Sequence, residues 1–291
     1  MISKKILSII VCPLCKGPLK EKDGVYCSRC NKVYPVVHGV PHLLAKDYYS
    51  DRSLSRSFEF KSKLRNSRMF RTLKYIFGAD FVPYNPLRKF HSLFLDKLLK
   101  GGLILNLGSG STKYPEGVIN VDIEHFPNVD IVADGCQLPF AEETFDAVIS
   151  EAVIEHVKYP KAFLDEVKRC LKKDSTIFIV APFVHPFHGY PSDFQRYSIE
   201  GLKVLFEDFE EVESGVYRGP SVAFVNFVSD YLAGLFCCKR LATHIFLKSI
   251  FTLMIFPIKF LDIILIRRKN SFTLAHCVYY IGKTKKQKVL T

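Results

Sequence analysis

The chain has 291 residues, 48% of them hydrophobic, so it can bury a substantial core and has room for one large domain with an attachment. Its net charge of +12 conceals an asymmetry: residues 1–100 hold 20 Lys and Arg against 7 Asp and Glu, residues 101–220 hold 10 against 20, and residues 221–291 hold 11 against 2. The basic flanks favour a polyanionic partner, such as nucleic acid, anionic lipid headgroups or a phosphate-linked substrate. A merely solvated basic surface explains either cluster taken alone.

The nine cysteines are not spaced like a disulfide framework, because four belong to one metal motif and five are scattered in apolar surroundings. The apolar stretch at the N-terminus is short and runs directly into Cys12, which argues against a secretory signal peptide. We therefore expect a protein of a reducing compartment, the cytoplasm.

Two Cys-x-x-Cys motifs stand near the N-terminus, separated by eleven residues. Four thiolates in two tight turns supply the closed tetrahedral site of structural Zn²⁺, which leaves no open catalytic position. Redox-active cysteine pairs are the alternative, and the pairing of two motifs at this distance favours zinc. Turn and strand signals at 17–19 and 23–26 predict a small ribbon. The predicted ligands are Cys12, Cys15, Cys27 and Cys30.

The cysteine motifs continue into Tyr34-Pro35-Val36-Val37-His38-Gly39-Val40-Pro41-His42. Over residues 8–45 this pattern is similar to the small zinc-ribbon activator subunits that partner RNA and protein methyltransferases, and to their single-domain bacterial relatives. The resemblance implies a ribbon that stabilises a methyltransferase, here fused to it in residues 1–45. Because the metal contributes folding energy, we expect a structural or substrate-docking role for the ribbon.

Residues 46–100 form a basic linker in which Lys and Arg alternate with Phe, Leu and Met. Apolar spacing of three and four predicts an amphipathic helix over 53–77, and a second helix over 87–99 follows the breaker at 84–86. A connecting helix packed on the next domain is the favoured interpretation. A basic face that grips phosphates is the alternative.

Three short apolar runs then end in glycine or aspartate. Residues 103–110 read Leu-Ile-Leu-Asn-Leu-Gly-Ser-Gly, residues 118–122 end at Asp122, and residues 131–134 end at Asp134. Glycines let the backbone approach a ligand closely, and open α/β sheets bind ligands at the carboxyl edge of their parallel strands. The runs therefore predict a nucleotide-type site, although glycines and aspartates also mark turns in any α/β sheet.

With Leu138-Pro139-Phe140 and the run at 145–150, this order resembles the class I S-adenosylmethionine-dependent methyltransferases of the small-molecule and glycan type. The resemblance covers about 103–220 and 272–284. It implies a Rossmann-like, seven-stranded α/β sheet in a domain spanning 101–291. The implied roles are a glycine loop under the methionine part of the cofactor, Asp122 on the ribose hydroxyls, and Asp134 by the adenine with Leu138 and Phe140 as apolar neighbours. The implied cofactor residues are Gly108, Ser109, Gly110, Asp122, Ile123, Asp134, Gly135 and Glu151.

The chain departs from that family between the glycine loop and the second strand. Only residues 111–117 intervene, which leaves no room for the usual helix. A dinucleotide binder needs the N-terminus of that helix to hold a pyrophosphate. The short connection therefore argues against NAD and suits a cofactor without phosphate.

Histidines follow the fourth and fifth strands, on the cofactor's edge of the sheet. In the resembled family the segment at 151–157 flanks the sulfonium, so His156 would be a base or would orient the loop. The fifth strand, 176–181, leads into a polar loop. There His185 and His188 are the leading bases for a hydroxyl acceptor, Asp193 is an orienting carboxylate and Arg196 would pair with an anionic part of the acceptor. A proline-rich surface loop is the alternative.

A helix at 200–206 and a sixth strand at 210–217 come next, and a final strand is predicted over 272–283. Residues 221–270 form an apolar insertion between these two strands, and charges interrupt every stretch before it reaches the roughly 20 residues that cross a bilayer. Helices lying in the membrane interface fit better. Extra core helices or a dimer interface are the alternatives.

These observations lead us to expect a cytoplasmic, peripherally membrane-associated methyltransferase that uses S-adenosylmethionine and structural Zn²⁺. Its acceptor would be a hydroxyl of a lipid-linked or cell-surface glycan intermediate. An RNA methyltransferase is the alternative, supported by the ribbon and the basic front half. A non-catalytic scaffold is the third hypothesis, disfavoured by the intact cofactor residues. The oligomeric state is left open.

Overall fold

The structure is a computed structural model of the full chain. The helix expected over 53–77, most of the one over 87–99, and the short connection at 111–116 lie outside the residues it describes; residues 94 and 96–99 are helical. The described residues are 2–21, 24–45, 94, 96–110, 117–189, 192–236 and 241–285.

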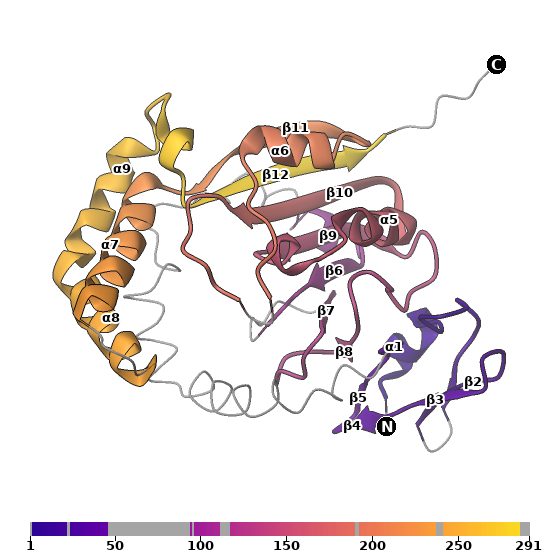
Figure 1. Ribbon diagram of the computed structural model, residues 1–291. Helices are drawn as coiled ribbons and strands as arrows, with labels where there is room; N and C mark the ends of the chain where they lie inside the picture. Colours follow the sequence, from indigo (N-terminus) through magenta and orange to yellow (C-terminus); the bar gives the residue numbers. More distant parts are fainter. Residues whose placement is uncertain are drawn as a thin grey trace.

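The centre of the molecule is a mixed seven-stranded sheet in the order β11-β12-β10-β9-β6-β7-β8 (Figure 1). The five strands from β10 to β8 run parallel, and β12 runs antiparallel to both of its neighbours. This arrangement confirms the predicted Rossmann-like α/β fold. The strands are β6 (Ile104–Leu107), β7 (Val118–Asp122), β8 (Ile131–Val132), β9 (Phe145–Glu151), β10 (Leu171–Pro182), β11 (Phe209–Arg218) and β12 (Cys277–Thr284).

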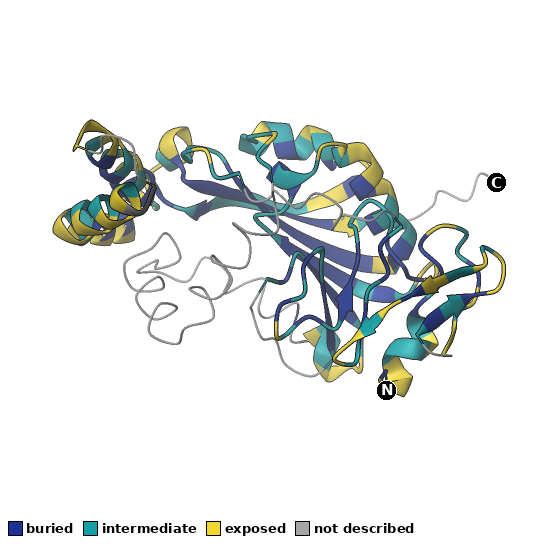
Figure 2. Cartoon of the chain, turned by 60° about the horizontal axis from the view of Figure 1, so that its bottom comes forward, coloured by how far each residue is buried: buried dark blue, intermediate teal, exposed yellow. Residues whose placement is uncertain are grey.

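Alternate residues of the central strands enter two different cores, because successive side chains of a strand point to opposite faces. Leu105 and Leu107 of β6 pack in one core with α5 (Pro160–Cys170) and α6 (Ile199–Leu205), whereas Ile104 faces the other core with Phe94. Both faces of the sheet are therefore covered, and the strands are buried, as Figure 2 shows.

Two strand boundaries differ from the prediction. The last strand was expected over 272–283, but residues 271–274 form the short 3₁₀ helix η4 (Ser271–Leu274) and β12 begins at Cys277. The fifth strand begins at Leu171 instead of 176, through an irregular stretch of pairing between Leu171 and Thr176. At both places the local sequence gives only a weak signal for where the strand begins. Pairing with a neighbouring strand decides the boundary there.

The N-terminal residues form helix α1 (Lys4–Ile9) and two small antiparallel sheets. They attach to the β8 edge of the main sheet: Val11 N–H donates to Pro139 O at 2.8 Å, and Leu43 N–H donates to Val132 O at 2.7 Å. Cys12 and Leu43 belong to the same core as the central strands. The ribbon thus shares its core with the main domain. Its strands are β1 (Lys20–Glu21), β2 (Val25–Cys27), β3 (Lys32–Tyr34), β4 (Val36–Val37) and β5 (Val40–Pro41).

The insertion between β11 and β12 is helical, as predicted, and stands at the opposite end of the sheet from the ribbon (Figure 1). Among the described residues, no helix is both long and apolar enough to span a bilayer. We call this insertion the helical arm. It consists of α7 (Pro220–Phe236), α8 (Leu241–Ile255), η3 (Phe256–Leu261) and α9 (Asp262–Leu265).

Candidate active site and cysteine cluster

The glycine loop after β6 is held against the end of β7. Gly108 and Ser109 N–H both donate to Val121 O, at 2.8 and 3.1 Å, and Gly110 N–H donates to Asp122 Oδ2 at 2.7 Å. The other carboxylate oxygen of Asp122 accepts from Glu124 N–H at 3.0 Å. These bonds place the loop and the carboxylate side by side at the carboxyl edge, where the resemblance puts the cofactor.

The loop after β8 is arranged in the same way, since Asp134 Oδ1 accepts from Cys136 N–H at 2.9 Å. Gly135 lies against Phe163 of α5. A Cβ added to Gly135 would lie only 2.8 Å from Phe163 Cδ2, so there is no room for a side chain. Leu138 and Phe140 were expected as neighbours of the adenine, but both side chains are fully buried in the core that the ribbon shares. They support the loop from beneath.

The edge fits a polar, phosphate-free cofactor in two respects. A Cβ built on Gly110 meets no atom of the described residues within 4 Å, so none of them fills the space beside this glycine. The hydroxyls of Ser109 and Ser150 are buried without a hydrogen-bond partner among the described residues, which leaves donors that a ligand can satisfy. Glu151 is held by Tyr217, whose hydroxyl donates to Oε2 at 2.7 Å. Ile123, half-buried, packs on a small core with Phe126.

Four imidazole rings line up beside this edge, and we call them the histidine row. The ring centroids of His156 and His188 are 4.8 Å apart, those of His188 and His185 are 4.6 Å apart, and those of His185 and His276 are 4.5 Å apart. The row therefore joins the segments after β9, after β10 and before β12. Its last ring contacts α7 of the helical arm, through 3.0 Å between His276 Nε2 and Asn226 Nδ2.

Burial keeps the row uncharged at neutral pH. It lowers the pKa of His156 and His185, and it lowers the pKa of His188 to about 4 with help from the neighbouring rings. Glu155, beside the row, has no exposed surface, and burial raises its pKa to about 8. Neutral imidazoles have a lone pair to offer, so the row can accept protons or bind a cation.

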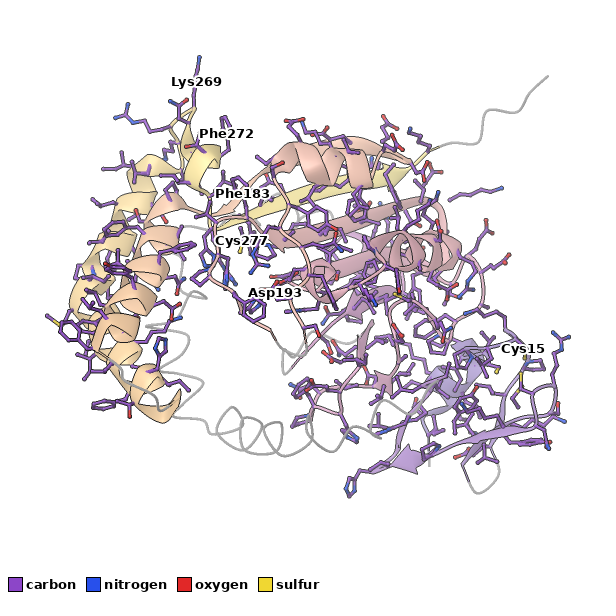
Figure 3. The ribbon with its side chains drawn as sticks, in the orientation of Figure 1. Cys15, Phe183, Asp193, Lys269, Phe272 and Cys277 are labelled. Atoms are coloured by element: carbon purple, nitrogen blue, oxygen red, sulfur yellow. The ribbon has the colours of Figure 1, made fainter. Side chains whose placement is uncertain are left out.

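The loop that carries His185 and His188 is pinned by an internal ion pair. Arg196 and Asp193 form a two-pronged pair, and Asp193 Oδ2 also accepts from His188 N–H at 2.8 Å. Arg196 holds the pKa of Asp193 well below its usual range. Arg196 was expected to meet an anionic part of the acceptor; its partner in the structure is Asp193, which Figure 3 labels near the centre of the molecule.

The sequence did not predict two residues of this site, Glu155 beside the row and His276 within it. Glu155 lies in the segment that drew attention to His156, and its place next to a histidine was the only signal. His276 precedes the last strand and carries no motif of its own. Phe183 N–H donates to His276 O at 3.0 Å, so it is strand pairing that brings His276 to the site.

The four N-terminal cysteines form a compact cluster, with Cys15 labelled in Figure 3. The Sγ atoms of Cys12 and Cys30 are 3.9 Å apart and those of Cys15 and Cys27 are 3.6 Å apart. Tetrahedral Zn–S bonds of about 2.3 Å place sulfur atoms about 3.8 Å apart. The cluster therefore fits structural zinc, and none of its cysteines is in a disulfide.

Comparison with known proteins matches both parts of the chain. A family model described as a methyltransferase domain matches residues 112–179, and one described as Trm112p-like protein matches residues 3–39. A UPF0434 protein of Methylobacillus flagellatus is 44% identical over 43 residues, which are 14% of this chain and 72% of that protein.

Two further comparisons match longer parts of the chain. A demethylmenaquinone methyltransferase of Renibacterium salmoninarum is 28% identical over 152 residues, 45% of this chain and 64% of its own length. Phosphoethanolamine N-methyltransferase 2 of Haemonchus contortus, solved with S-adenosyl-L-methionine, is 16% identical, with 78% of this chain and 60% of that chain covered and a TM-score of 0.44. The chain is thus a class I S-adenosylmethionine-dependent methyltransferase with an N-terminal Trm112-like zinc-ribbon region.

Proposed function

We propose that this enzyme methylates a hydroxyl of a small lipid-linked or glycan intermediate, and that it does so at an anionic membrane surface in the cytoplasm. The observation that carries the proposal is an exposed apolar face on the helical arm, directly beside the histidine row. An acceptor with an apolar anchor would then be held by the arm while its polar end reaches the row.

Exposed residues run along the helical arm, as Figure 2 shows, and many of them are apolar. Burying such side chains in the interfacial region of a bilayer is favourable, and basic residues at headgroup level add attraction to anionic lipids. Arg267, Arg268 and Lys269 are exposed at the end of the arm, where Figure 3 labels Lys269. The exposed apolar residues include Phe224, Tyr231, Phe246, Leu253, Met254, Ile264 and Leu265.

The arm and the chemistry are connected. Asn226 of α7 contacts His276, whose ring is 4.5 Å from that of His185. Lys248 of α8 is close enough to contribute to the lowered pKa of His185. An acceptor lying along the arm therefore has a short path to the row.

His185 is the proposed base. Its Nδ1 lies 2.6 Å from Pro186 O, and because a carbonyl only accepts, Nδ1 carries the ring proton and Nε2 keeps its lone pair. When bound, the cofactor supplies a methyl group on a positively charged sulfur. The lone pair of His185 takes the hydroxyl proton as the acceptor oxygen forms its bond to the methyl carbon, and the electron pair of the C–S bond stays on sulfur.

The relative named demethylmenaquinone methyltransferase bears the name of a small-molecule acceptor, which supports a small acceptor here. RNA is the second acceptor to test, because residues 3–39 match the Trm112p-like family and the first 100 residues are strongly basic. Binding to RNA through phosphate contacts weakens steeply with salt.

Vesicle co-sedimentation tests the membrane part of the proposal. The full chain should sediment with vesicles containing anionic lipid, and much less with neutral vesicles. Replacing Phe246 and Met254 together by Glu should abolish sedimentation, whereas Val204→Glu, an equally exposed apolar position on α6, should not change it. Equal loss in all variants, or a dimer in solution that covers the arm, would contradict the membrane role.

The acceptor is tested by supplying methyl-labelled cofactor to the enzyme with either a lipid-linked glycan extract or total RNA. We expect label in the glycan fraction, and its loss with Asp122→Ala but not with Asp165→Ala, an exposed acid on α5. Label in RNA instead would replace the proposed acceptor with the alternative. Mass spectrometry of cells carrying each variant gives the same comparison in vivo.

A further inference from the structure

Beside the histidine row lies a buried carboxylate that no described group satisfies. The side chain of Glu155 has no exposed surface, and neither of its oxygens has a hydrogen-bond partner among the described residues. Leaving a buried carboxyl group unsatisfied is unfavourable, and more so when the group is charged. A bound cation is the partner that would best satisfy a buried carboxylate, because their charges are opposite.

Two imidazole nitrogens face the same oxygen of that carboxylate. Nε2 of His156 lies 3.8 Å from Glu155 Oε1, and Nε2 of His188 lies 3.9 Å from it. One donor atom from each of the three residues lies within 4.8 Å of the others. This is the arrangement of two histidines and one carboxylate around a common point.

One of the two imidazoles is already oriented as a metal ligand requires. Nδ1 of His156 donates to Ser192 O, which leaves Nε2 with its lone pair. Nδ1 of His188 is buried without a hydrogen-bond partner among the described residues, 3.7 Å from Asp193 Oδ2. Metal-binding histidines almost always donate their second ring N–H to a carbonyl or a carboxylate. His156 has such a bond, and Asp193 is the carboxylate that a small shift of the His188 ring would bring within its reach.

We propose that Glu155, His156 and His188 form a second metal site, for a divalent transition-metal ion such as Zn²⁺ or Ni²⁺, at the acceptor side of the active site. Two imidazoles favour these ions over Mg²⁺ and Ca²⁺, which prefer oxygen ligands. The inference goes beyond the proposed function and does not depend on which acceptor is methylated.

The geometry requires only a small contraction on binding. Bonds of about 2.0–2.2 Å place tetrahedral ligand atoms about 3.4 Å apart, so each of the two Nε2 atoms would move about half an ångström closer to Glu155 Oε1. Three protein ligands leave at least one open position. The side chain of His188 is 39% exposed, so that position opens toward the acceptor side and not into the core.

A metal ion at this site would have an open coordination position for the acceptor, which the closed four-cysteine site does not have. A cation held by these residues would lower the pKa of a coordinated hydroxyl, and His185, 4.6 Å from His188 ring to ring, would remain free of the ion to act as the base. Glu155 neutralises part of the ion's charge. Asp193 and Arg196 form a pair without net charge, so they neither attract nor repel the ion strongly.

Metal counting tests the site on the full chain. The protein is freed of loosely bound metal, loaded with Zn²⁺, Mn²⁺ or Mg²⁺, desalted, and measured by inductively coupled plasma mass spectrometry. We expect two Zn²⁺ per chain after loading with Zn²⁺, and no occupation of the second site by Mg²⁺ or Mn²⁺, which prefer oxygen ligands. Glu155→Gln and His188→Asn should each retain one ion, with at least a 100-fold weaker second site, because even the loss of an outer partner costs about 10–100-fold. His185→Asn, the matched control, should retain two.

Cobalt spectroscopy separates the two sites. The first Co²⁺ should give the intense sulfur-to-metal absorption of a cysteine site, and the second should add only weaker bands without it. One ion in the unchanged protein, two ions in Glu155→Gln, or sulfur-to-metal absorption from both equivalents would each overturn the proposal. Glutamine matches the size of Glu155 without its charge, so an unaltered melting temperature of Glu155→Gln excludes misfolding. None of these measurements depends on methyl transfer.

Discussion

Gly108 is packed very closely against a neighbouring segment in the glycine loop after β6. Its φ is +75°, and a Cβ there would lie 2.1 Å from Val153 Cγ2, in the segment that leads from β9 to the histidine row. Only a residue without a side chain fits both the left-handed backbone and this close approach. The loop and the row are therefore in contact through Gly108.

Gly108→Ala should destabilise the protein by about 2–4 kcal/mol, the combined cost of a left-handed alanine and a core overlap. Because relief of the overlap moves the loop, affinity for S-adenosylmethionine should fall at least tenfold. Thermal unfolding and calorimetric titration measure the two effects. Gly234→Ala is the control, since a Cβ there meets nothing within 4 Å on helix α7. Equal behaviour of the two variants would refute the close-approach argument.

Asp146 is a charged residue near the start of β9, at the amino ends of the parallel strands and away from the cofactor residues. Partial burial opposes its ionisation, but hydrogen bonds from Lys172 Nζ and Leu103 N–H, both 2.8 Å long, lower its pKa. An acid with a lowered pKa contributes stability above its unfolded pKa of about 3.9, and the contribution is lost as the pH falls through the folded pKa.

Asp146→Asn should therefore cost about 1–2 kcal/mol at pH 7, the worth of a hydrogen bond to a charged group. The difference from the unchanged protein should shrink as the pH falls below about 4. Urea unfolding at several pH values measures it. A difference that stays constant down to acid pH would show that the carboxylate charge contributes nothing.

At the scale of elements, the helical arm depends on one buried aspartate. Asp262, with no exposed surface, accepts hydrogen bonds from Ser221 N–H at 2.9 Å and Val222 N–H at 3.2 Å. These are free N–H groups of the first turn of α7, which need a partner. A residue at the start of α9 thus fixes the beginning of α7, 40 residues earlier.

Asp262→Ala should leave two buried donors unsatisfied and loosen α7 by about 1–3 kcal/mol. Amide hydrogen exchange should speed up in α7 and α8 by tenfold or more, while exchange in the central strands stays slow. Asp165→Ala, at an exposed position of α5, is the control. Uniform acceleration over the whole chain would mean that the arm is not a separate cooperative unit.

At the scale of the molecule, ribbon and methyltransferase share one core. Cys12, Val25 and Tyr34 pack with the strands, and Lys16 Nζ reaches across to Glu166 of α5 at 2.8 Å and to Leu138 O at 3.0 Å. Zinc that holds the ribbon therefore also stabilises the β8 edge that carries Asp134.

Removal of that zinc, by a strong chelator or by Cys12→Ser, should lower the unfolding temperature of the whole chain and weaken cofactor binding. Differential scanning calorimetry should show one shifted transition, because a shared core unfolds cooperatively. Cys170→Ser changes a buried cysteine outside the cluster and should keep its zinc. A ribbon that melts alone, with the main transition unmoved, would contradict the coupling.

Much of this protein could be predicted along the chain, because the relevant signals are local. Cysteine spacing predicted the metal cluster, and the apolar runs ending in Gly108, Asp122 and Asp134 carried the resemblance that predicted the fold class and the edge at which the cofactor is expected. The period of the apolar residues and the spacing of the cysteines and glycines reflect the geometry of single strands and turns. Residues that are neighbours in the sequence decide that geometry.

Only the tertiary structure brought Glu155 and His276 to the histidine row, gave Arg196 its partner Asp193, and buried Leu138 and Phe140 beneath the ribbon. It likewise decided where β12 begins. These features arise from contacts between segments far apart in sequence, formed when strands pair and loops meet at one edge of the sheet. Burial and the neighbours across that edge set the pKa of a histidine or the partner of an arginine, and no local pattern records them.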